Sequence, residues 1–241
     1  MSDYSNIIEG VFSENGLEGL LNKSVIQKLN SLIDRTVNTN KKFNITAITN
    51  EEEIIFKHIA DSATVIKFIP QNAKLLDVGT GGGFPALPIS IMRPDVSVYA
   101  LDSTAKKLAY IDETATVLEL PNIKTVCGRA EEHGRSVNYR ERFDFVTARA
   151  VSALNVLTEL CLPFVKVGGI FAAMKGLSAS DEAELAKSGV VQLGGSKFID
   201  NSFTLTHNGE DLHRHILVSK KIKQTPPSFP RQYSRITKKP L

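Results

Sequence analysis

The sequence predicts an α/β fold in which a mostly parallel sheet is flanked by helices and preceded by a helical extension. Three observations predict it. From residue 74 onward, apolar runs of strand length alternate with stretches of helix length. A glycine cluster follows the first of these runs, at residues 79–83, which are all glycine except Thr80. The residues before the runs carry apolar side chains at helical spacing and show no strand alternation.

The N-terminal region, residues 1–70, is predicted to be helical. Apolar residues recur at helical spacing through 25–33 and again through 54–69. A capping box formed by Thr49 and Glu52 is expected to begin the second of these helices, because the two side chains can satisfy each other's free backbone amides. We therefore separate this region from the sheet that follows.

Residues 71–222 are predicted to form the main α/β domain. Its parallel strands are expected at 75–79, 96–101, 123–127, 143–148 and 170–174. Its helices are expected near 86–92, 104–118 and 153–165, which makes right-handed crossovers between the strands. Later elements are a charged helix at 180–187, a strand around 190–193 and a final strand at 213–222.

The closing segment, residues 223–241, contains four prolines and is predicted to have no regular structure. From Lys220 onward the chain carries seven Lys or Arg and no acidic residue, so the rest of the chain has an excess of acidic side chains. Two interpretations remain open. Arg231 and its neighbours grip RNA phosphates, with Phe229 and Tyr233 stacking on bases, or the segment packs back on its own domain.

Composition limits the class of protein. The chain has 241 residues, 42% of them hydrophobic, which suffices for one substantial core. The N-terminus shows no leader pattern and no apolar run is long enough for a membrane span, so we expect a cytoplasmic protein, monomeric and without an obligate protein partner. Cys127 and Cys161 have apolar neighbours and no metal-ligand spacing. We expect both to be buried, with neither a disulfide nor a metal site.

The glycine cluster is predicted to hold a cofactor. Asp77 ends the first strand, Gly79 and Gly81 allow the positive φ of a tight turn, and Asp102 ends the neighbouring strand. A dinucleotide loop needs a third glycine, where this chain has Phe84, and Asp77 would repel a pyrophosphate. S-adenosylmethionine (SAM) carries an ammonium, a sulfonium and a ribose, which suit the two carboxylates better.

Further candidate residues lie at the same edge of the predicted sheet. Ala130 and Glu131 follow the third strand, where a backbone amide and a carboxylate could bind the adenine of SAM. Arg149 ends the fourth strand, and its guanidinium suits guanine O6, a phosphate or the SAM carboxylate equally. Lys175, after the fifth strand, and His58, on the second N-terminal helix, are candidate substrate-binding residues, as is Arg231.

The end of the fourth strand also restricts the chemistry. It carries neither the Asn/Asp-Pro-Pro-aromatic turn of methyltransferases that act on exocyclic amines nor the cysteine nucleophile of those that act on pyrimidine carbon. Guanine N7 has an unprotonated lone pair, so its in-line attack on a sulfonium methyl needs no general base. The sequence identifies no catalytic acid or base.

Several segments together resemble the bacterial 16S ribosomal RNA guanine-N7 methyltransferases of the RsmG family, formerly glucose-inhibited division protein B. The segments are 44–48, 57–62, 76–85, 101–107, 128–131, 147–150, 174–176 and 229–241. The resemblance implies a class I SAM-dependent, Rossmann-like fold and SAM contacts at Gly79, Phe84, Ala130, Glu131 and Arg149. It also implies a specific substrate, a guanine in the decoding-region loop of 16S rRNA, as the free RNA or in the small ribosomal subunit.

Three other functions stay open at this point. The enzyme could methylate another RNA. The glycines, with Asp102 as a ribose ligand, would also suit an NAD-dependent oxidoreductase. The third alternative is an RNA-binding module with a vestigial cofactor site, against which Asp77, Gly79, Gly81 and Asp102 all argue.

Overall fold

Seven strands form one sheet in the order β3-β2-β1-β4-β5-β7-β6. The computed structural model describes residues 3–241, so residues 1 and 2 of the predicted helical region lie outside the described part. The first five strands pair in parallel, and β7 runs antiparallel to β5 and β6. The strands are β1 (Lys74–Val78), β2 (Ser97–Asp102), β3 (Ile123–Cys127), β4 (Phe143–Arg149), β5 (Val165–Lys175), β6 (Ile199–His207) and β7 (Glu210–Lys220).

Helices precede the sheet and connect its strands. The N-terminal ones are α1 (Ser5–Glu14), α2 (Lys23–Asn40), α3 (Glu51–Ile54), a π-helical stretch (Ile55–Ala60) and α4 (Asp61–Ala63), with short 3₁₀ turns at Glu18–Leu20 and Ile66–Phe68. The later ones are α5 (Ala86–Met92), α6 (Ala105–Val117), α7 (Ala130–His133), α8 (Leu154–Cys161) with a 3₁₀ turn (Leu162–Phe164), α9 (Ala179–Leu185), α10 (Lys187–Gln192) and α11 (Tyr233–Lys238). No helix among residues 3–241 is long and apolar enough to cross a membrane.

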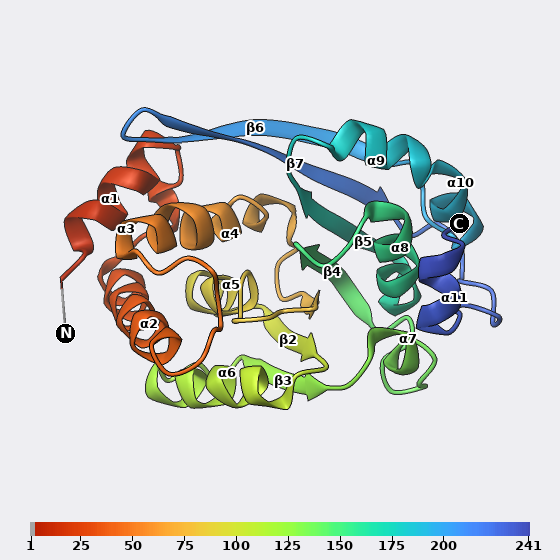
Figure 1. The fold of residues 1–241 in the computed structure, drawn as a ribbon, viewed down its shortest axis with the longest axis horizontal. Coiled ribbons are helices and arrows are strands. Elements are labelled where there is room, and N and C mark those ends of the chain that lie inside the picture. Colours follow the sequence, from red (N-terminus) through yellow and green to blue (C-terminus); the bar gives the residue numbers. More distant parts are fainter. Residues whose placement is uncertain (1–2) are drawn as a thin grey trace.

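Helices cover both faces of the sheet, because successive strand residues point to opposite sides. Leu75 packs with the N-terminal helices, α5 and α6, whereas Leu76 packs with α8, α9 and α10. Figure 1 shows the strands running between these two groups of helices. The predicted α/β fold is therefore confirmed. Ile8 and Leu29 belong to the same hydrophobic cluster as Leu75, and the domain boundaries at 70 and 222 stay predictions.

The strand order explains where a ligand site is expected. The chain moves outward from β1 through β2 to β3 and then returns to the other side of β1 with β4. Ligands of open α/β sheets bind at such a reversal, beyond the carboxyl ends of the strands. The residues after β1, β2, β3 and β4 meet at this edge, as the sequence predicted.

The antiparallel edge of the sheet was predicted only in part. Strand β7 coincides with the expected run at 213–222, but β6 was not expected. The two strands join at Asn208 and Gly209, both at positive φ (50° and 79°). An Asn-Gly pair between two strands is a strong hairpin signal, because the turn matches the strand twist. The Asn208-Gly209 pair is visible in the sequence and would have predicted β6.

The prediction of a strand around 190–193 is wrong, because these residues are helical and belong mainly to α10. Val190 and Leu193 are buried whereas Val191 and Gln192 are exposed, a spacing of three residues that is helical and not alternating. Gly194, at φ 89°, ends the helix, and the amide of Gly195 bonds to the carbonyl of Val190 (2.8 Å). Tertiary packing and the Gly-Gly stop outweigh the strand preference of two valines.

Two local predictions in the N-terminal and central regions are also wrong. The helix from residue 51 is capped by Asn50, whose side chain accepts from the amide of Glu53 (3.0 Å), and not by Thr49. Cys161 is buried as expected, but Cys127 is exposed because it lies in the outermost parallel strand, β3.

The closing segment packs on the domain and contains a helix, contrary to the prediction of no regular structure. Helix α11 lies between Pro230 and Pro240, and its Ile236 is fully buried against α8. Phe229 is 8% exposed, so it is a core residue and is not free to stack on a base. Neither proline lies inside the helix, so the helix can form between them.

Candidate active site

The loop after β1 has the backbone conformation that the glycines predicted. Gly79, Gly81 and Gly83 have φ of 72°, 57° and 87°. The amide of Gly79 bonds to the carbonyl of Leu101 (2.8 Å), which ties the loop to the end of β2. A Cβ on Gly79 would lie 2.6 Å from Cγ2 of Val151, in the loop after β4. Only glycine therefore fits at residue 79.

The two predicted carboxylates lie on neighbouring strands but in different surroundings. Asp102 ends β2, and its two oxygens accept from the amides of Gly81 (3.0 Å) and Thr104 (2.8 Å). Asp77 is fully buried behind the loop, and among residues 3–241 its oxygens, with the Thr80 hydroxyl, are the buried side-chain atoms without a hydrogen-bond partner. Burial raises the pKa of Asp77 to about 7, against the lowering effects of the nearby Thr80 hydroxyl and Arg149.

The first cavity lies at the edge of the sheet where these loops meet and has a volume of about 220 Å³. Gly79, Asp102, Ala130 and Glu131 line it, so four predicted site residues come together here. The other lining residues come from the ends of β1 and β2 and from segments further along the chain, and they are Val78, Leu101, Ser103, Gly128, Arg129, Ala150, Val151, Leu160 and Tyr233.

A second cavity, of about 340 Å³, adjoins the first through Ala150, which lines both. Its remaining lining residues are Ile48, Lys57, His58, Asp61, Arg149, Met174, Lys175, Gly176 and Arg214. Lysine and arginine side chains outnumber the single carboxylate among them. The structure thus brings three candidate residues, His58, Arg149 and Lys175, into one cavity next to the first, where the basic side chains each have a carboxylate partner.

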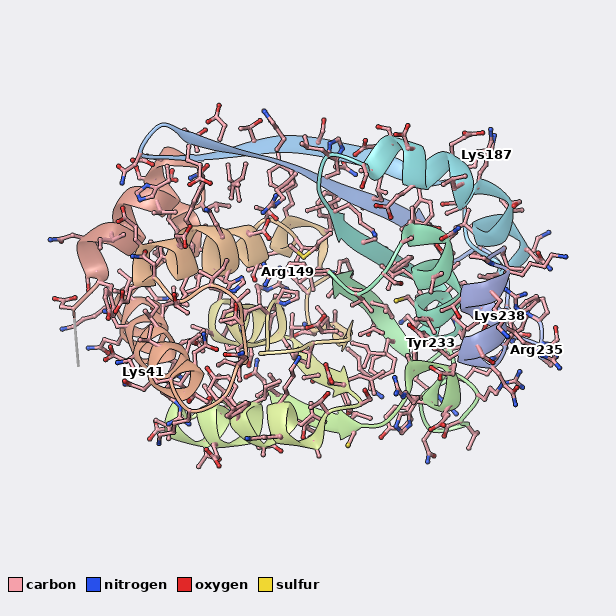
Figure 2. The ribbon with its side chains drawn as sticks, in the orientation of Figure 1. Lys41, Arg149, Lys187, Tyr233, Arg235 and Lys238 are labelled. Atoms are coloured by element: carbon pink, nitrogen blue, oxygen red, sulfur yellow. The ribbon has the colours of Figure 1, made fainter. Side chains whose placement is uncertain are left out.

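An ion-pair network holds Arg149 in the second cavity. Its guanidinium donates to Oδ2 of Asp61 (2.9 Å) and to the carbonyl of Lys57 (3.0 Å), while Arg214 donates to the other oxygen of Asp61 (3.0 Å). The Asp61 side chain is only 5% exposed. Figure 2 shows Arg149 between the ends of the central strands and the helix that carries Asp61. Arg149 is therefore positioned by a carboxylate of the N-terminal region.

His58 is a neutral hydrogen-bonding group in this network. Nη2 of Arg149 donates to its Nδ1 (3.0 Å), which leaves the proton on Nε2, 2.6 Å from Oγ1 of Thr46. Burial, together with the charge of Arg149, lowers the pKa of His58 to about 3. The ring stacks on Phe84, with centroids 4.6 Å apart. Because its lone pair is already engaged, His58 is not free to act as a general base.

The last two candidate residues have carboxylate partners. Lys175 donates to Glu182 (2.7 Å) and to the carbonyl of Ser152 (2.6 Å), within the second cavity. Arg231 lies elsewhere, on the surface of α8, where it donates to both oxygens of Glu159. The Glu159 side chain is fully buried. The contacts of Arg231 are therefore those of a structural anchor for the closing segment.

Sequence reasoning missed Asp61 and Arg214, which line the second cavity. It considered Tyr233 only as a residue that stacks on RNA bases, whereas the structure places Tyr233 on the wall of the first cavity. Asp61 follows His58 by one helical turn, a spacing that could have placed both on one face. The π-helical stretch that holds His58 is a further structural mark of the site, because such distortions are frequent where function demands them. No local sequence pattern predicts that Arg214 lines the second cavity or that Tyr233 lines the first.

The residues of the first cavity fit SAM. Gly79 and Val151 lie against each other on the cavity wall, where a Cβ on Gly79 would displace Val151, and Asp102 and Glu131 place carboxylates along the same wall. Asp102 would hold the ribose hydroxyls, while Glu131 and the Ala130–Glu131 peptide would hold the adenine. Asp77 does not line the cavity. Its carboxyl group instead lies buried behind the glycine loop, and its raised pKa of about 7 means that it is only partly ionised at neutral pH.

We predict that the pKa of His58 makes the protein less stable in mild acid. The unfolded chain binds a proton at His58 below pH 6.5, and the folded protein does so only near pH 3. The free energy of unfolding therefore falls as pH decreases through this window, by up to about 1.4 kcal/mol per pH unit from this group. Urea unfolding between pH 4 and pH 7 measures the slope.

The variant that tests this is His58→Gln, which keeps an acceptor for Arg149 and a donor for Thr46 but does not titrate. It should show a shallower loss of stability between pH 6.5 and pH 4 than the unchanged protein. His213→Gln, on the exposed hairpin, controls for the general effect of replacing a histidine by glutamine. Identical slopes for the unchanged protein and His58→Gln would contradict the buried neutral state.

Solved structures define the class of protein to which this fold belongs. A SAM-dependent O-methyltransferase from Thermotoga maritima superposes with a TM-score of 0.53 at 13% identity, covering 81% of this chain and 72% of that one. M. jannaschii TYW2, solved in complex with AdoMet, has a TM-score of 0.52 at 15% identity, covering 68% of this chain and 76% of that one. The chain has the fold of the class I SAM-dependent methyltransferases.

Sequence comparison identifies the family within this class. Residues 25–216 match the model of the GidB family, described as rRNA small subunit methyltransferase G. Ribosomal RNA small subunit methyltransferase G of Caldicellulosiruptor bescii is 44% identical over 222 residues, which are 90% of this chain and 91% of that one. Its counterpart from Clostridium perfringens is 39% identical over 99% of both chains. The chain belongs to the rRNA small subunit methyltransferase G family, as the sequence motifs predicted.

Proposed function

We propose that this protein transfers a methyl group from SAM to N7 of a guanine in the decoding-region loop of 16S rRNA. It would act in the cytoplasm on the small ribosomal subunit or its RNA. The observation that carries the proposal is the pair of cavities joined at Ala150, one built around Gly79 and one lined by several basic side chains. A methyl donor in the first would face a nucleotide in the second, in a chain whose family is named for rRNA methylation.

The residues of the second cavity would position a base and not deprotonate it. When bound, SAM supplies an electrophilic methyl on a sulfonium. Arg149 and Lys175 supply N–H donors for guanine O6 or the adjoining phosphate, and their carboxylate partners hold them in place. His58 keeps its lone pair on Arg149. Alignment of N7 with the methyl group then accounts for the rate without a general base, which supports the proposed target.

Methyl transfer from labelled SAM tests the proposal directly. Incorporation is measured with naked 16S RNA and with assembled small subunits, and the modified nucleotide is located by cleavage at 7-methylguanine. We expect incorporation at one guanine with at least one of the two substrates. Incorporation at another base or into another RNA would overturn the assignment of the target. Retention of NADH but not of SAM would support the oxidoreductase alternative instead.

We predict that the exposed cations of the closing segment contribute to RNA binding. Arg235, Lys238 and Lys239 are exposed, so their replacement by Gln should weaken RNA binding and leave SAM binding unchanged. For every phosphate that is no longer neutralised, the slope of log affinity against log salt should fall by about 0.7 to 0.9. Arg231 is left unchanged because it pairs with Glu159. An unaltered slope would confine RNA recognition to the cavities and the N-terminal helices.

A further inference from the structure

Tyr233 is an aromatic residue on the wall of the first cavity that comes from the far end of the chain. It begins α11, and it lines the cavity together with Gly79, Asp102 and Glu131. Figure 2 shows Tyr233 toward the middle of the molecule, whereas Arg235 and Lys238 lie on the outer side of the same helix. The closing segment therefore contributes a side chain to the cofactor cavity itself.

The segment that carries Tyr233 is anchored on both sides of it. Before it, Arg231 is held by Glu159 and Phe229 is buried in the core. After it, Ile236 is fully buried against Val156 and Leu160 of α8. These contacts fix the helix on the domain, so the position of Tyr233 at the cavity does not depend on a mobile tail.

The side chain of Tyr233 has no hydrogen-bond or ring partner within residues 3–241, which sets it apart from the side chains of the other tyrosines; the carbonyl of Tyr233 accepts from the Thr237 hydroxyl. The Tyr233 hydroxyl makes no hydrogen bond, its ring makes no aromatic contact, and the residue is 43% exposed. The other four each have a polar or ring partner: Tyr4 with Asp34, Tyr99 with Phe143, Tyr110 with Thr36 and Tyr139 with His133. A partly exposed aromatic ring without a partner, on a helix anchored beside a cavity, has a face free for stacking.

The surroundings of Tyr233 place it at one end of the cavity. Ala130 packs against the cluster formed by Val156, Leu160 and Ile236, the same cluster that anchors α11. Leu160 also lines the cavity. Tyr233 therefore lies on the part of the wall that includes Ala130 and Leu160. One aromatic ring, the apolar side chains of Ala130 and Leu160 and the Glu131 carboxylate on the same cavity suit a purine base, whose faces stack and whose amine needs an acceptor.

We propose that Tyr233 of the C-terminal helix stacks on the adenine of SAM and so makes the closing segment part of the cofactor site. The proposal rests on the SAM site of the proposed function and adds a binding residue to it. It predicts that the closing segment affects cofactor affinity through this ring and not through its positive charges.

Two variants test the proposal by equilibrium binding. Tyr233→Ala should weaken SAM and adenosine binding at least fivefold, because stacking of one base on an aromatic ring contributes about 1 to 3 kcal/mol. Arg235→Ala, on the same helix, is the matched control and should bind SAM as the unchanged protein does. Thermal unfolding should be the same for both variants, because each side chain is exposed.

The chain contains no tryptophan, so Tyr233→Trp introduces a single fluorescent reporter at this wall. Adenosine and SAM should each change its emission at saturating concentration, while methionine should not. Unchanged SAM affinity in Tyr233→Ala, or a reporter that responds to an RNA oligonucleotide and not to adenosine, would overturn the proposal. Failure of the proposed function gives different results. Without a SAM site the unchanged protein would not bind SAM at all, and with another RNA target it would still bind SAM and the comparison of variants would be unaffected.

Discussion

Gly79→Val is expected to reduce SAM affinity by more than about 100-fold in a protein that still folds, because the new side chain must enter the first cavity or displace Val151, which also lines it. Gly79 has φ 72°, a region that a β-branched residue adopts only under strain. The new side chain would also occupy the space between the loop and Val151, where a Cβ alone comes within 2.6 Å. Isothermal titration with SAM measures the loss, and circular dichroism checks the fold.

Gly168→Val is the matched control for the strain. Gly168 also has positive φ, 89°, but nothing lies within 4 Å of its Cβ. Both variants should therefore lose stability from the backbone strain, and only Gly79→Val should lose SAM binding. Loss of SAM binding in both, or in neither, would remove Gly79 from the cofactor site.

Arg231→Ala is expected to lower the free energy of unfolding by about 3 kcal/mol at neutral pH, because removal of the guanidinium would leave a buried charge without its counter-ion. The charge is the Glu159 carboxylate, whose side chain is fully buried. The backbone amide of residue 231 still donates to Glu159 in the variant, which keeps the loss at the lower end of the usual range. Urea unfolding at constant pH measures it.

A second substitution distinguishes an anchor from an RNA ligand. Combining Arg231→Ala with Glu159→Gln removes the unpaired charge and should recover part of the lost stability. RNA affinity, measured on folded protein, should change less for Arg231→Ala than for the triple replacement of Arg235, Lys238 and Lys239. Full stability of Arg231→Ala together with weaker RNA binding would restore Arg231 as a substrate residue.

The central part of the fold could be predicted because its signals are local. The run that ends at Asp77, the glycines that follow and the second run that ends at Asp102 are close together in the chain, and the structure places them as neighbouring strands and their connecting loop. The Asn208-Gly209 turn is equally local and would have predicted β6. The prediction of a strand at residues 190–193 failed because the packing of α10 on the domain, and not the strand preference of its valines, determines that this segment is helical.

The partners of the site residues could not be predicted in the same way. Arg149 and Asp61 are 88 residues apart in the chain, and Arg231 and Glu159 are 72 apart. In the sequence, Arg149 and Arg231 are equally suited to bind a phosphate or a guanine, because each is a guanidinium without a local acidic partner. The fold is needed to show that one lies in the cavity beside Ala150 and the other anchors the closing segment.

Order and spacing along the chain were enough to predict the α/β class, the tight glycine loop at Gly79 and the family, because each depends on residues that lie close together in the sequence. Folding was required to establish which cations face the second cavity, that His58 is neutral, and that Tyr233 reaches the cofactor cavity. These properties depend on burial and on pairs of side chains from distant segments. Desolvation and the choice of ionic partner exist only once the chain has folded.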